Sequence, residues 1–251
     1  MSGKIFVVSI GPGDNSLISP AAEAALEEAD VFIGYATYLD LISEICPEKP
    51  REFSLMRQET ERAEAAVQAA RSGKKIAVIS GGDAGIFGMA GLILETIEAD
   101  GLSGQIDAEI FPGISALNAA AALLGAPLMT DFAAVSLSNY LIPLEKILKR
   151  VSAAAETGFI LCLYNPRSSV RTEPWEKTLE ILGKVLPAET PVGIVTNAYR
   201  KNQKAVITHL SDLCRQEVNM DSIVIIGNET TRIISGKMVT PRGYQLKGTV
   251  L

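Results

Sequence analysis

Short apolar runs alternate with helix-like segments along the first half of this chain, and this alternation constrains the fold more than any other feature. The runs KIFVVSI (4–10), VFIG (31–34), IAVIS (76–80) and AEIFPG (108–113) are typical of buried strands. Helix-like segments follow them, the first with Ser19 as a candidate N-cap and Pro20 at the first helical position. The pattern predicts parallel strands joined by helical crossovers, and ligands bind such sheets at the carboxyl ends of the strands.

The pattern changes after Gly125. A strand-like run at 132–138, a helix-like segment at 144–155, the strand-like run GFILCLY (158–164) and a second helix-like segment at 175–186 come first. The later runs PVGIVTNA (191–198), KAVITHL (204–210), SIVIIGN (222–228) and RIISGKMV (232–239) have short polar gaps, which favour antiparallel pairing or hairpins. We therefore predict two α/β domains, residues 1–125 and 126–251, with a boundary near GAPLM (125–129).

Composition limits the classes of function. The net charge of −6 and the pI of about 5.0 disfavour a nucleic-acid partner. The three cysteines lie far apart and His209 is the single histidine, so neither a disulfide framework nor a His-rich metal site is expected. The N-terminal apolar run is too short for a signal peptide, and no apolar run reaches the length of a membrane span. We expect a soluble cytoplasmic protein with no membrane partner and no bound metal.

The loop GPGD (11–14) follows the first predicted strand. A dinucleotide-binding GxGxxG motif would need glycine at position 16, where this chain has Ser16, and no Walker A motif occurs. A tight turn and a ligand-binding loop both remain open for this segment.

The segment SGGDAGIFG (80–88) follows the third predicted strand and contains four glycines and Asp83. So many glycines indicate that the backbone comes close to something else, and a ligand is the first candidate. Asp83 could face that ligand or cap the helix that follows. Capping alone would leave the four glycines unexplained.

Three further segments each have a structural alternative. Ser115 in FPGISA (111–116) could bind a ligand or cap the next helix. Arg167 and Arg171 in YNPRSSVR (164–171) suit carboxylates, although solvated loop charges are commoner. TPRGY (240–244) could be a surface turn.

In this order, the GPGD loop, the GGD-x-x-x-FG segment and the PG-[IV]-[ST]-A segment resemble the tetrapyrrole methyltransferases that use S-adenosylmethionine. The resemblance covers nearly the whole chain. Within that family, GYATYLDLI (34–42), SGGDAGIFGMA, LYNPRS and GKMVTPRGY look like the branch that methylates C17 of precorrin-3B or cobalt-factor III and contracts the ring, in cobalamin biosynthesis. One departure is Ala84, where the family usually has proline after GGD. We expect a looser loop there and retained binding, because proline stiffens a loop through its fixed φ.

The resemblance implies a class III methyltransferase fold, with two α/β domains and a cofactor cleft between them that also holds the tetrapyrrole, and a homodimer. S-adenosyl-L-homocysteine would be the cofactor product. The implied cofactor contacts are Pro12, Gly81, Gly82, Asp83, Ile86, Ser115, Ala116, Asn165 and Ala198.

Methyl transfer to an electron-rich carbon needs alignment and desolvation more than a strong base. Ring contraction needs an acid or a hydrogen-bond donor. The candidates for that role are Asp14, Tyr164, Arg167 and Thr196. The candidates for binding the acetate and propionate groups of the substrate are Arg167, Arg171, Arg200, Lys201, Arg232 and Arg242.

Three alternatives stay open. A related methylase could act at a different carbon of the macrocycle. A nucleotide-binding enzyme could use GPGD and GGDAG as phosphate loops, although the Walker and dinucleotide patterns are missing. A non-catalytic tetrapyrrole carrier would bind the pigment and ignore S-adenosylmethionine.

Overall fold

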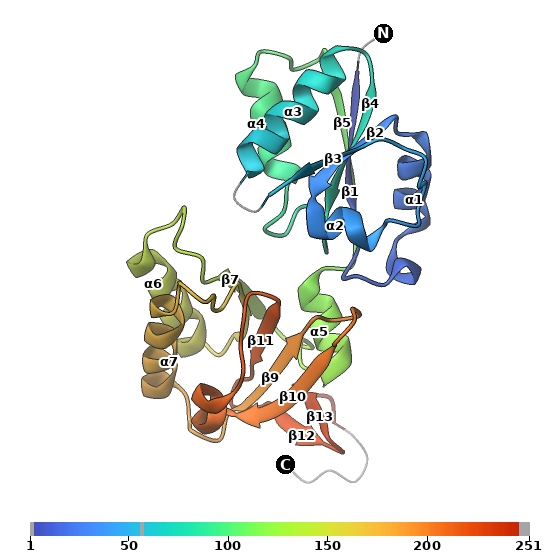
Figure 1. Cartoon of the computed structure of the whole chain (residues 1–251). Helices are drawn as coiled ribbons and strands as arrows, with labels where there is room; N and C mark the ends of the chain where they lie inside the picture. The colour runs from blue at the N-terminus through green and yellow to red at the C-terminus, as the bar shows by residue number, and fades with distance from the viewer. Residues whose placement is uncertain (1–2, 56–57, 246–251) are drawn as a thin grey trace. The chain divides into compact units, whose positions relative to one another are not determined.

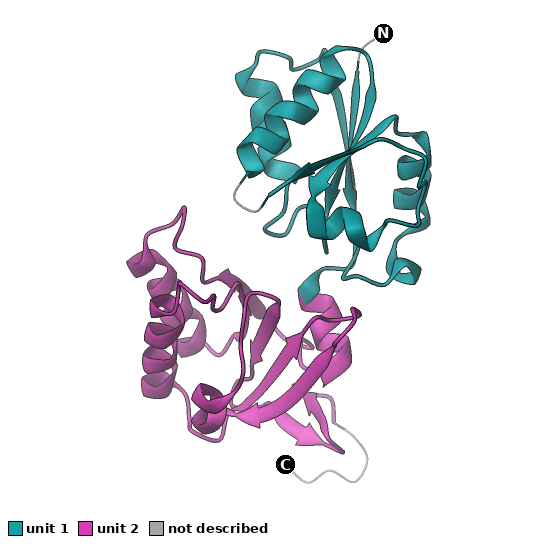
Figure 2. Ribbon diagram, viewed as in Figure 1, with its two compact units in different colours: residues 1–116 teal, residues 117–251 magenta. Residues whose placement is uncertain are grey.

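The computed structural model describes residues 3–55 and 58–245, and the chain forms two compact units, residues 1–116 and 117–251 (Figure 2). The units divide after Ala116, the first residue of the helix α5 (Ala116–Leu124), whereas our expected domain boundary lies after the whole helix. The packing of α5 explains the earlier division, because Leu124 lies against Gly193 and the Leu117 N–H bonds to Tyr164, both in the second unit.

The first unit is built on a fully parallel five-stranded sheet in the order β3-β2-β4-β1-β5. Its strands are β1 (Lys4–Ser9), β2 (Val31–Tyr35), β3 (Arg51–Ser54), β4 (Lys75–Ser80) and β5 (Asp107–Phe111). Its helices are α1 (Pro20–Glu28), α2 (Ala36–Leu41), α3 (Glu59–Arg71) and α4 (Ala90–Ala99), and a short 3-10 helix, η1 (Asn15–Leu17), follows β1. The parallel strands and helical crossovers predicted from the sequence are confirmed.

The two faces of this sheet bury separate cores, because successive side chains of a strand point to opposite faces. Ile5 and Val7 of β1 pack with α3 and α4, while Phe6 and Val8 pack with α1 and α2. Figure 1 shows these two helix pairs on opposite sides of the sheet. Helices on both faces leave the edges of the sheet, and in particular the loops after the strands, available for binding.

The second unit has a mixed five-stranded sheet in the order β10-β9-β11-β8-β7. Its strands are β7 (Phe132–Ser136), β8 (Ile160–Tyr164), β9 (Pro191–Thr196), β10 (Lys204–His209) and β11 (Ser222–Ile226). β7 and β8 are parallel, whereas β11 is antiparallel to both of its neighbours and β10 is antiparallel to β9. The antiparallel pairing predicted for the last runs is confirmed.

A smaller sheet in the order β12-β13-β6 completes the second unit. Its strands are β6 (Gly125–Ala126), β12 (Arg232–Ile234) and β13 (Lys237–Val239). The remaining helices are α6 (Leu144–Glu156), α7 (Glu173–Val185) and the 3-10 helix η2 (Leu210–Arg215). α6 and α7 cover one face of the larger sheet (Figure 1) and bury Val151 and Trp175 against it.

Candidate functional site

The loops after the two central strands of the first sheet are joined by their backbones. β1 and β4 are neighbours, so GPGD and SGGDAGIFG begin side by side at the carboxyl edge. Gly11 and Gly82 form an isolated antiparallel bridge, in which the Gly11 N–H donates to the Gly82 carbonyl at 3.1 Å and the Gly82 N–H donates to the Gly11 carbonyl at 2.7 Å. This bridge sets the relative position of the two loops.

Asp83 connects the loop after β4 to the loop after β5. Its Oδ1 accepts from the Gly85 N–H at 2.8 Å and its Oδ2 accepts from the Gly113 N–H at 2.9 Å. The Ser9 Oγ adds a third link, accepting from the Ala84 N–H at 2.9 Å. Asp83 therefore organises the loops by binding backbone amides, a role that the sequence analysis did not foresee.

The glycines of SGGDAGIFG have close neighbours within the protein itself. A Cβ on Gly81 would lie 2.5 Å from the Tyr38 ring, and one on Gly88 would lie 2.7 Å from the Ala84 carbonyl oxygen. Gly82 has φ +67°, a conformation that favours glycine. Close approach of the chain's own atoms thus accounts for Gly81 and Gly88, and the positive φ accounts for Gly82, so a ligand is not needed to explain these three glycines.

Most cofactor-contact residues predicted in the first unit lie together. Pro12 is next to the bridged Gly11, and the Ala116 nitrogen lies 3.4 Å from the position that a Cβ on Gly82 would take. Ser115 is buried, whereas Ile86 is 39% exposed at the outer part of its loop. The structure brings together Pro12, Gly81, Gly82, Asp83, Ser115 and Ala116, with Ile86 on the same loop as Asp83.

Phe87 is a strained residue in this loop. Its φ of +54° is unusual for a bulky aromatic residue, and its side chain is 56% exposed. Strain of this kind concentrates at functional sites. The glycine-rich loop extends through Gly88, so α4 begins only at Ala90.

Asp14, a candidate acid, is exposed and acts as the N-cap of η1. Its Oδ1 accepts from the Ser16 N–H at 2.9 Å and from the Ser16 Oγ at 2.7 Å. These two hydrogen bonds lower the pKa of Asp14 below its ordinary value of 3.8. A lowered pKa keeps this carboxyl ionised at neutral pH and disfavours it as a proton donor.

The second sheet has its own carboxyl edge, where β7, β8 and β9 end in Ser136, Tyr164 and Thr196. Asn165 follows β8 with φ +50°, and its Nδ2 donates to the Ser136 Oγ at 3.0 Å. Thr196 shares a hydrogen bond of 2.8 Å with Ser222. Tyr164 is buried, and its hydroxyl accepts from the Leu117 N–H at 3.0 Å.

Arg171 holds this edge together. Its Nη1 donates to the Leu137 carbonyl at 2.6 Å, and its Nη2 donates to the Asn165 carbonyl at 2.8 Å and contacts the Met220 sulfur at 3.2 Å. The guanidinium that we expected to bind substrate carboxylates is thus engaged with the backbone of two loops. Arg167, four residues earlier, is exposed.

The other predicted cations are divided between two places. Ala198, Arg200 and Lys201 lie in the turn between β9 and β10, where Tyr199 has φ +56°. Arg232 and Arg242 lie elsewhere, next to the Thr231–Thr240 hydrogen bond of 2.9 Å in the smaller sheet. Thr231 also donates to the Asn228 side chain, which in turn donates to the Gly158 carbonyl just before β8 begins. Arg232 and Arg242 therefore lie near the amino end of β8, whereas Tyr164 is at its carboxyl end.

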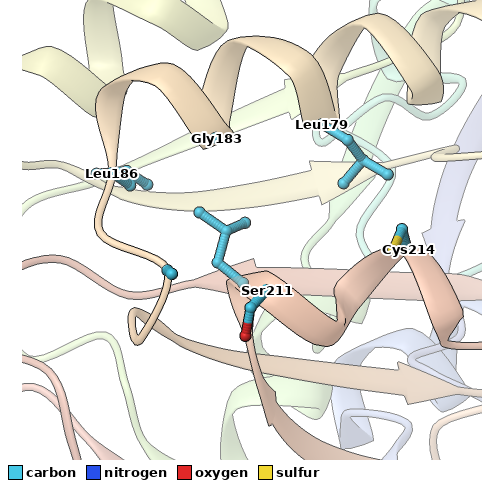
Figure 3. A pocket seen from close by; sticks show the side chains of 7 residues that line it. Leu179, Gly183, Leu186, Ser211 and Cys214 are labelled. Atoms are coloured by element: carbon cyan, nitrogen blue, oxygen red, sulfur yellow. The ribbon is translucent and has the colours of Figure 1, made fainter.

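An apolar pocket of about 250 Å³ lies between α7 and η2 (Figure 3). Its lining residues are Leu179, Gly183, Leu186, Ala188, Leu210, Ser211 and Cys214. None of them is a predicted site residue. α7 leads into the amino end of β9 and η2 follows the end of β10, so the pocket is remote from the edge that carries Tyr164 and Thr196.

Three further functions that the sequence analysis disfavoured can be compared with the structure: metal binding, membrane insertion and thiol chemistry. Within residues 3–55 and 58–245, no group of three or more His, Cys, Asp or Glu side chains is placed to hold a metal ion. None of the helices in those residues has the length and hydropathy needed to cross a bilayer. Burial raises the pKa of Cys162 to about 12, which keeps this thiol unreactive.

The family model of the tetrapyrrole (corrin/porphyrin) methylases matches residues 4–214. The chain belongs to this family. The resemblance read from the GPGD, GGD and PGIS segments is thereby confirmed, and so is the predicted fold class.

Relatives match almost the whole chain. The cobalt-factor III methyltransferase of Priestia megaterium is 42% identical over 252 residues, which are 100% of this chain and 47% of that protein. The chain thus spans about half of that relative's length. A probable cobalt-factor III C(17)-methyltransferase of Salmonella typhimurium is 43% identical, over 96% of this chain and 99% of the relative. The precorrin-3B C(17)-methyltransferase of a Sinorhizobium species is 38% identical, over 97% and 98%.

Solved structures of methyltransferases are similar to this chain as well. The crystal structure of the methyltransferase CobJ has a TM-score of 0.90 and 34% identity, covering 96% of this chain and 100% of that one. The cobalt precorrin-4 methyltransferase CbiF has a TM-score of 0.71 at 22% identity, covering 89% and 94%, and supports the fold alone.

Proposed function

We propose that this protein is an S-adenosylmethionine-dependent methyltransferase that methylates C17 of a tetrapyrrole with ring contraction, in cobalamin biosynthesis. The observation that carries the proposal is the match, at 43% and 38% identity, to two relatives named as C17-methyltransferases, of which this chain covers 99% and 98%. The relatives named for cobalt-factor III are more similar than the one named for precorrin-3B. We therefore take the cobalt-containing substrate first and the metal-free one second.

The residues of the first unit suit the cofactor. Three loops converge at one edge, and Ser115, Asp83 and several backbone groups offer polar contacts there. Gly85 is exposed, and a Cβ on it would meet only the Asp83 Oδ1, at 3.2 Å, so the backbone at this point is open to a ligand. When bound, S-adenosylmethionine supplies an electrophilic methyl group. The chain has to hold the acceptor carbon in line with that group and exclude water.

Asp83 acts in this scheme by positioning the loops. Both of its oxygens accept backbone N–H groups, so its charge is already partly neutralised. A carboxylate that bound the sulfonium strongly would stabilise the ground state, and the engagement of Asp83 limits that effect. Its remaining lone pairs suit a hydroxyl or ammonium group of the cofactor.

Asn165 and Ala198 in the second unit remain proposed cofactor contacts. Tyr164 and Thr196 at the same edge are the hydrogen-bond donors we favour for ring contraction, because the lowered pKa of Asp14 disfavours that residue as an acid. Exposed Arg167 is our first candidate for a substrate carboxylate. Arg200 and Lys201 are the next candidates. Arg171 ranks lower because its guanidinium already donates to two backbone carbonyls, and Arg232 and Arg242 rank lower because they lie in or next to the smaller sheet.

A homodimer and a cytoplasmic location belong to the same proposal, since the family resemblance implies the first and the composition favours the second.

Calorimetric titration with S-adenosylhomocysteine tests the cofactor assignment, with ATP and NAD as controls. Selective micromolar binding of S-adenosylhomocysteine is the expected result. Binding of ATP or NAD instead would support the nucleotide-binding alternative. A folded protein that binds the tetrapyrrole but not S-adenosylhomocysteine would be a carrier, and the proposal would fail.

A further inference from the structure

Arg62 in α3 is a buried cation whose hydrogen-bond partners, within the residues that the structure describes, are neutral. Its side chain is 5% exposed. Its Nε donates to the Ser54 Oγ at 2.6 Å, its Nη2 donates to the Leu55 carbonyl at 3.2 Å, and its Nη1 donates to the Met89 thioether sulfur at 3.4 Å, which is a weak acceptor. Among the described residues, no carboxylate forms a salt bridge with Arg62. A buried charge without a directly bonded counter-charge is costly.

Two other cations in the same unit show how the protein usually avoids this cost. Lys49 donates to carbonyls at the end of α1, including those of Leu26 and Ala29. Arg51 donates to carbonyls at the end of α2, including those of Leu39 and Ile42. The carboxyl end of a helix carries partial negative charge, so each of these cations is compensated where it lies.

Arg62 lies at the opposite kind of helix end. Its contact Met89 is the N-cap residue of α4, a ten-residue helix whose N-terminus carries partial positive charge. This end has no side-chain cap and no acidic residue in its first turn. A buried guanidinium thus meets a helix N-terminus that has no side-chain cap, although the Ala90 N–H there donates to the Ala84 carbonyl, and both groups favour an anion.

The cluster adjoins the candidate cofactor loops. Ser54 ends β3 and donates to the Gly34 carbonyl in β2, so Arg62 is at the carboxyl edge of the first sheet. Tyr38 packs edge-to-face on Tyr35 and lies against Gly81. Both tyrosines come from GYATYLDLI, a segment that the proposed cofactor contacts leave unused. Burial, the largest influence, lowers the pKa of Arg62, although the charges of Glu59 and Glu61 in the same helix act in the opposite direction.

We propose that Arg62 and the first turn of α4 form a binding site for a carboxylate of one of the two ligands of the reaction. The inference rests on the proposed function, which supplies two sources of that group. One is the amino-acid end of S-adenosylmethionine, and the other is an acetate or propionate side chain of the tetrapyrrole. The planar fork of arginine suits a carboxylate from either source.

The test compares Arg62→Gln with the matched control Arg51→Gln. Each variant removes a cation from the first unit, but Arg51 is compensated by helix carbonyls. Affinities are measured for S-adenosylhomocysteine and for 5′-methylthioadenosine, which keeps the adenosine and thioether but lacks the amino-acid carboxylate. The KM for the tetrapyrrole is measured in parallel, and circular dichroism confirms folding.

Loss of a charge-assisted hydrogen bond corresponds to a roughly tenfold to hundredfold weakening. A cofactor carboxylate predicts that loss for S-adenosylhomocysteine in Arg62→Gln, with 5′-methylthioadenosine unchanged. A tetrapyrrole carboxylate predicts a comparable rise in KM with unchanged S-adenosylhomocysteine affinity. Arg51→Gln should change neither quantity. If folded Arg62→Gln changes neither quantity, or if Arg51→Gln changes them equally, the inference is overturned.

A second measurement separates this inference from the proposed function. Succinate should raise the melting temperature of the wild type and of Arg51→Gln more than chloride at equal ionic strength, and this excess should vanish in Arg62→Gln. The assay needs no turnover, so a protein that fails to methylate can still show the site. Should Arg62→Gln not fold, Arg62→Lys takes its place, because one ammonium group cannot replace the fork. Equal responses in all proteins would overturn the site.

Discussion

The carboxyl edges of the two sheets are held together by different means. In the first unit the loops join through backbone, by the Gly11–Gly82 bridge and the two amides bound by Asp83. In the second unit a long side chain, that of Arg171, reaches from its own loop to two carbonyls. The first sheet is wholly parallel and the second is mixed.

This difference predicts which substitutions should destabilise each edge. Backbone-joined loops tolerate no added side-chain volume, so their glycines matter more than their polar residues. The loops of the second unit depend on the Arg171 guanidinium, so we expect them to tolerate substitutions of the neighbouring side chains.

Gly113→Ala should have the largest effect on stability. The new Cβ would lie 2.5 Å from both the Gly82 carbonyl oxygen and the Ser9 Cβ, so the backbone must move. We expect a loss of about 3 kcal/mol in the free energy of unfolding, measured in urea. Gly183→Ala in α7 is the control, since it meets open space and should raise stability by about 0.5–1 kcal/mol. A Gly113→Ala protein as stable as the wild type would contradict the account of the first edge.

Arg171→Met should come next. The change leaves the Leu137 and Asn165 carbonyls without their charged donor, and we expect a loss of about 2–3 kcal/mol in the same urea assay. Arg167→Ala is the matched control, with a stability change within about 0.5 kcal/mol and a raised KM for the tetrapyrrole. If Arg171→Met kept full stability and raised KM instead, the guanidinium would be a substrate ligand and the contrast between the edges would fail.

Asp83→Asn should cost less, about 1–2 kcal/mol. Asparagine keeps the shape, but its NH2 group would face one of the two amides that the carboxylate accepts. Calorimetry should also show weaker binding of S-adenosylhomocysteine, because the loops lose their link. Asp100→Asn, at the exposed C-cap of α4, is the control and should change neither quantity. If Asp83→Asn left both affinity and stability unchanged, the proposed role of Asp83 in joining the loops after β4 and β5 would be wrong.

The smallest effect concerns Asp14 and pH. Its folded pKa is lowered by the hydrogen bonds from Ser16, so the folded state binds its proton less readily than the unfolded state. The stabilisation is therefore present above about pH 3.8 and is lost as the pH falls through the lowered folded pKa. The stability difference between wild type and Asp14→Asn should shrink over that range in pH-dependent urea unfolding. A difference that grows on acidification would reverse the sign of the shift.

The sequence predicted the parallel first sheet and the antiparallel late strands, because apolar runs and short polar gaps are local signals. It did not predict β3, because the sequence REFS of that strand contains the charged residues Arg51 and Glu52 and no apolar run. The convergence of Pro12, Asp83 and Ser115 followed from strand ends meeting at one edge. The engagement of Arg171 and the neutral surroundings of Arg62 depend on contacts between distant segments, and no local pattern reports them.

Methylation at C17 can be observed by NMR. The protein is incubated with cobalt-factor III, and in parallel with precorrin-3B, and with S-adenosylmethionine carrying a ¹³C-labelled methyl group. The account predicts one labelled methyl per macrocycle, attached to C17 of a ring-contracted product. A labelled methyl at another carbon, or no transfer by folded protein to either substrate, would contradict it.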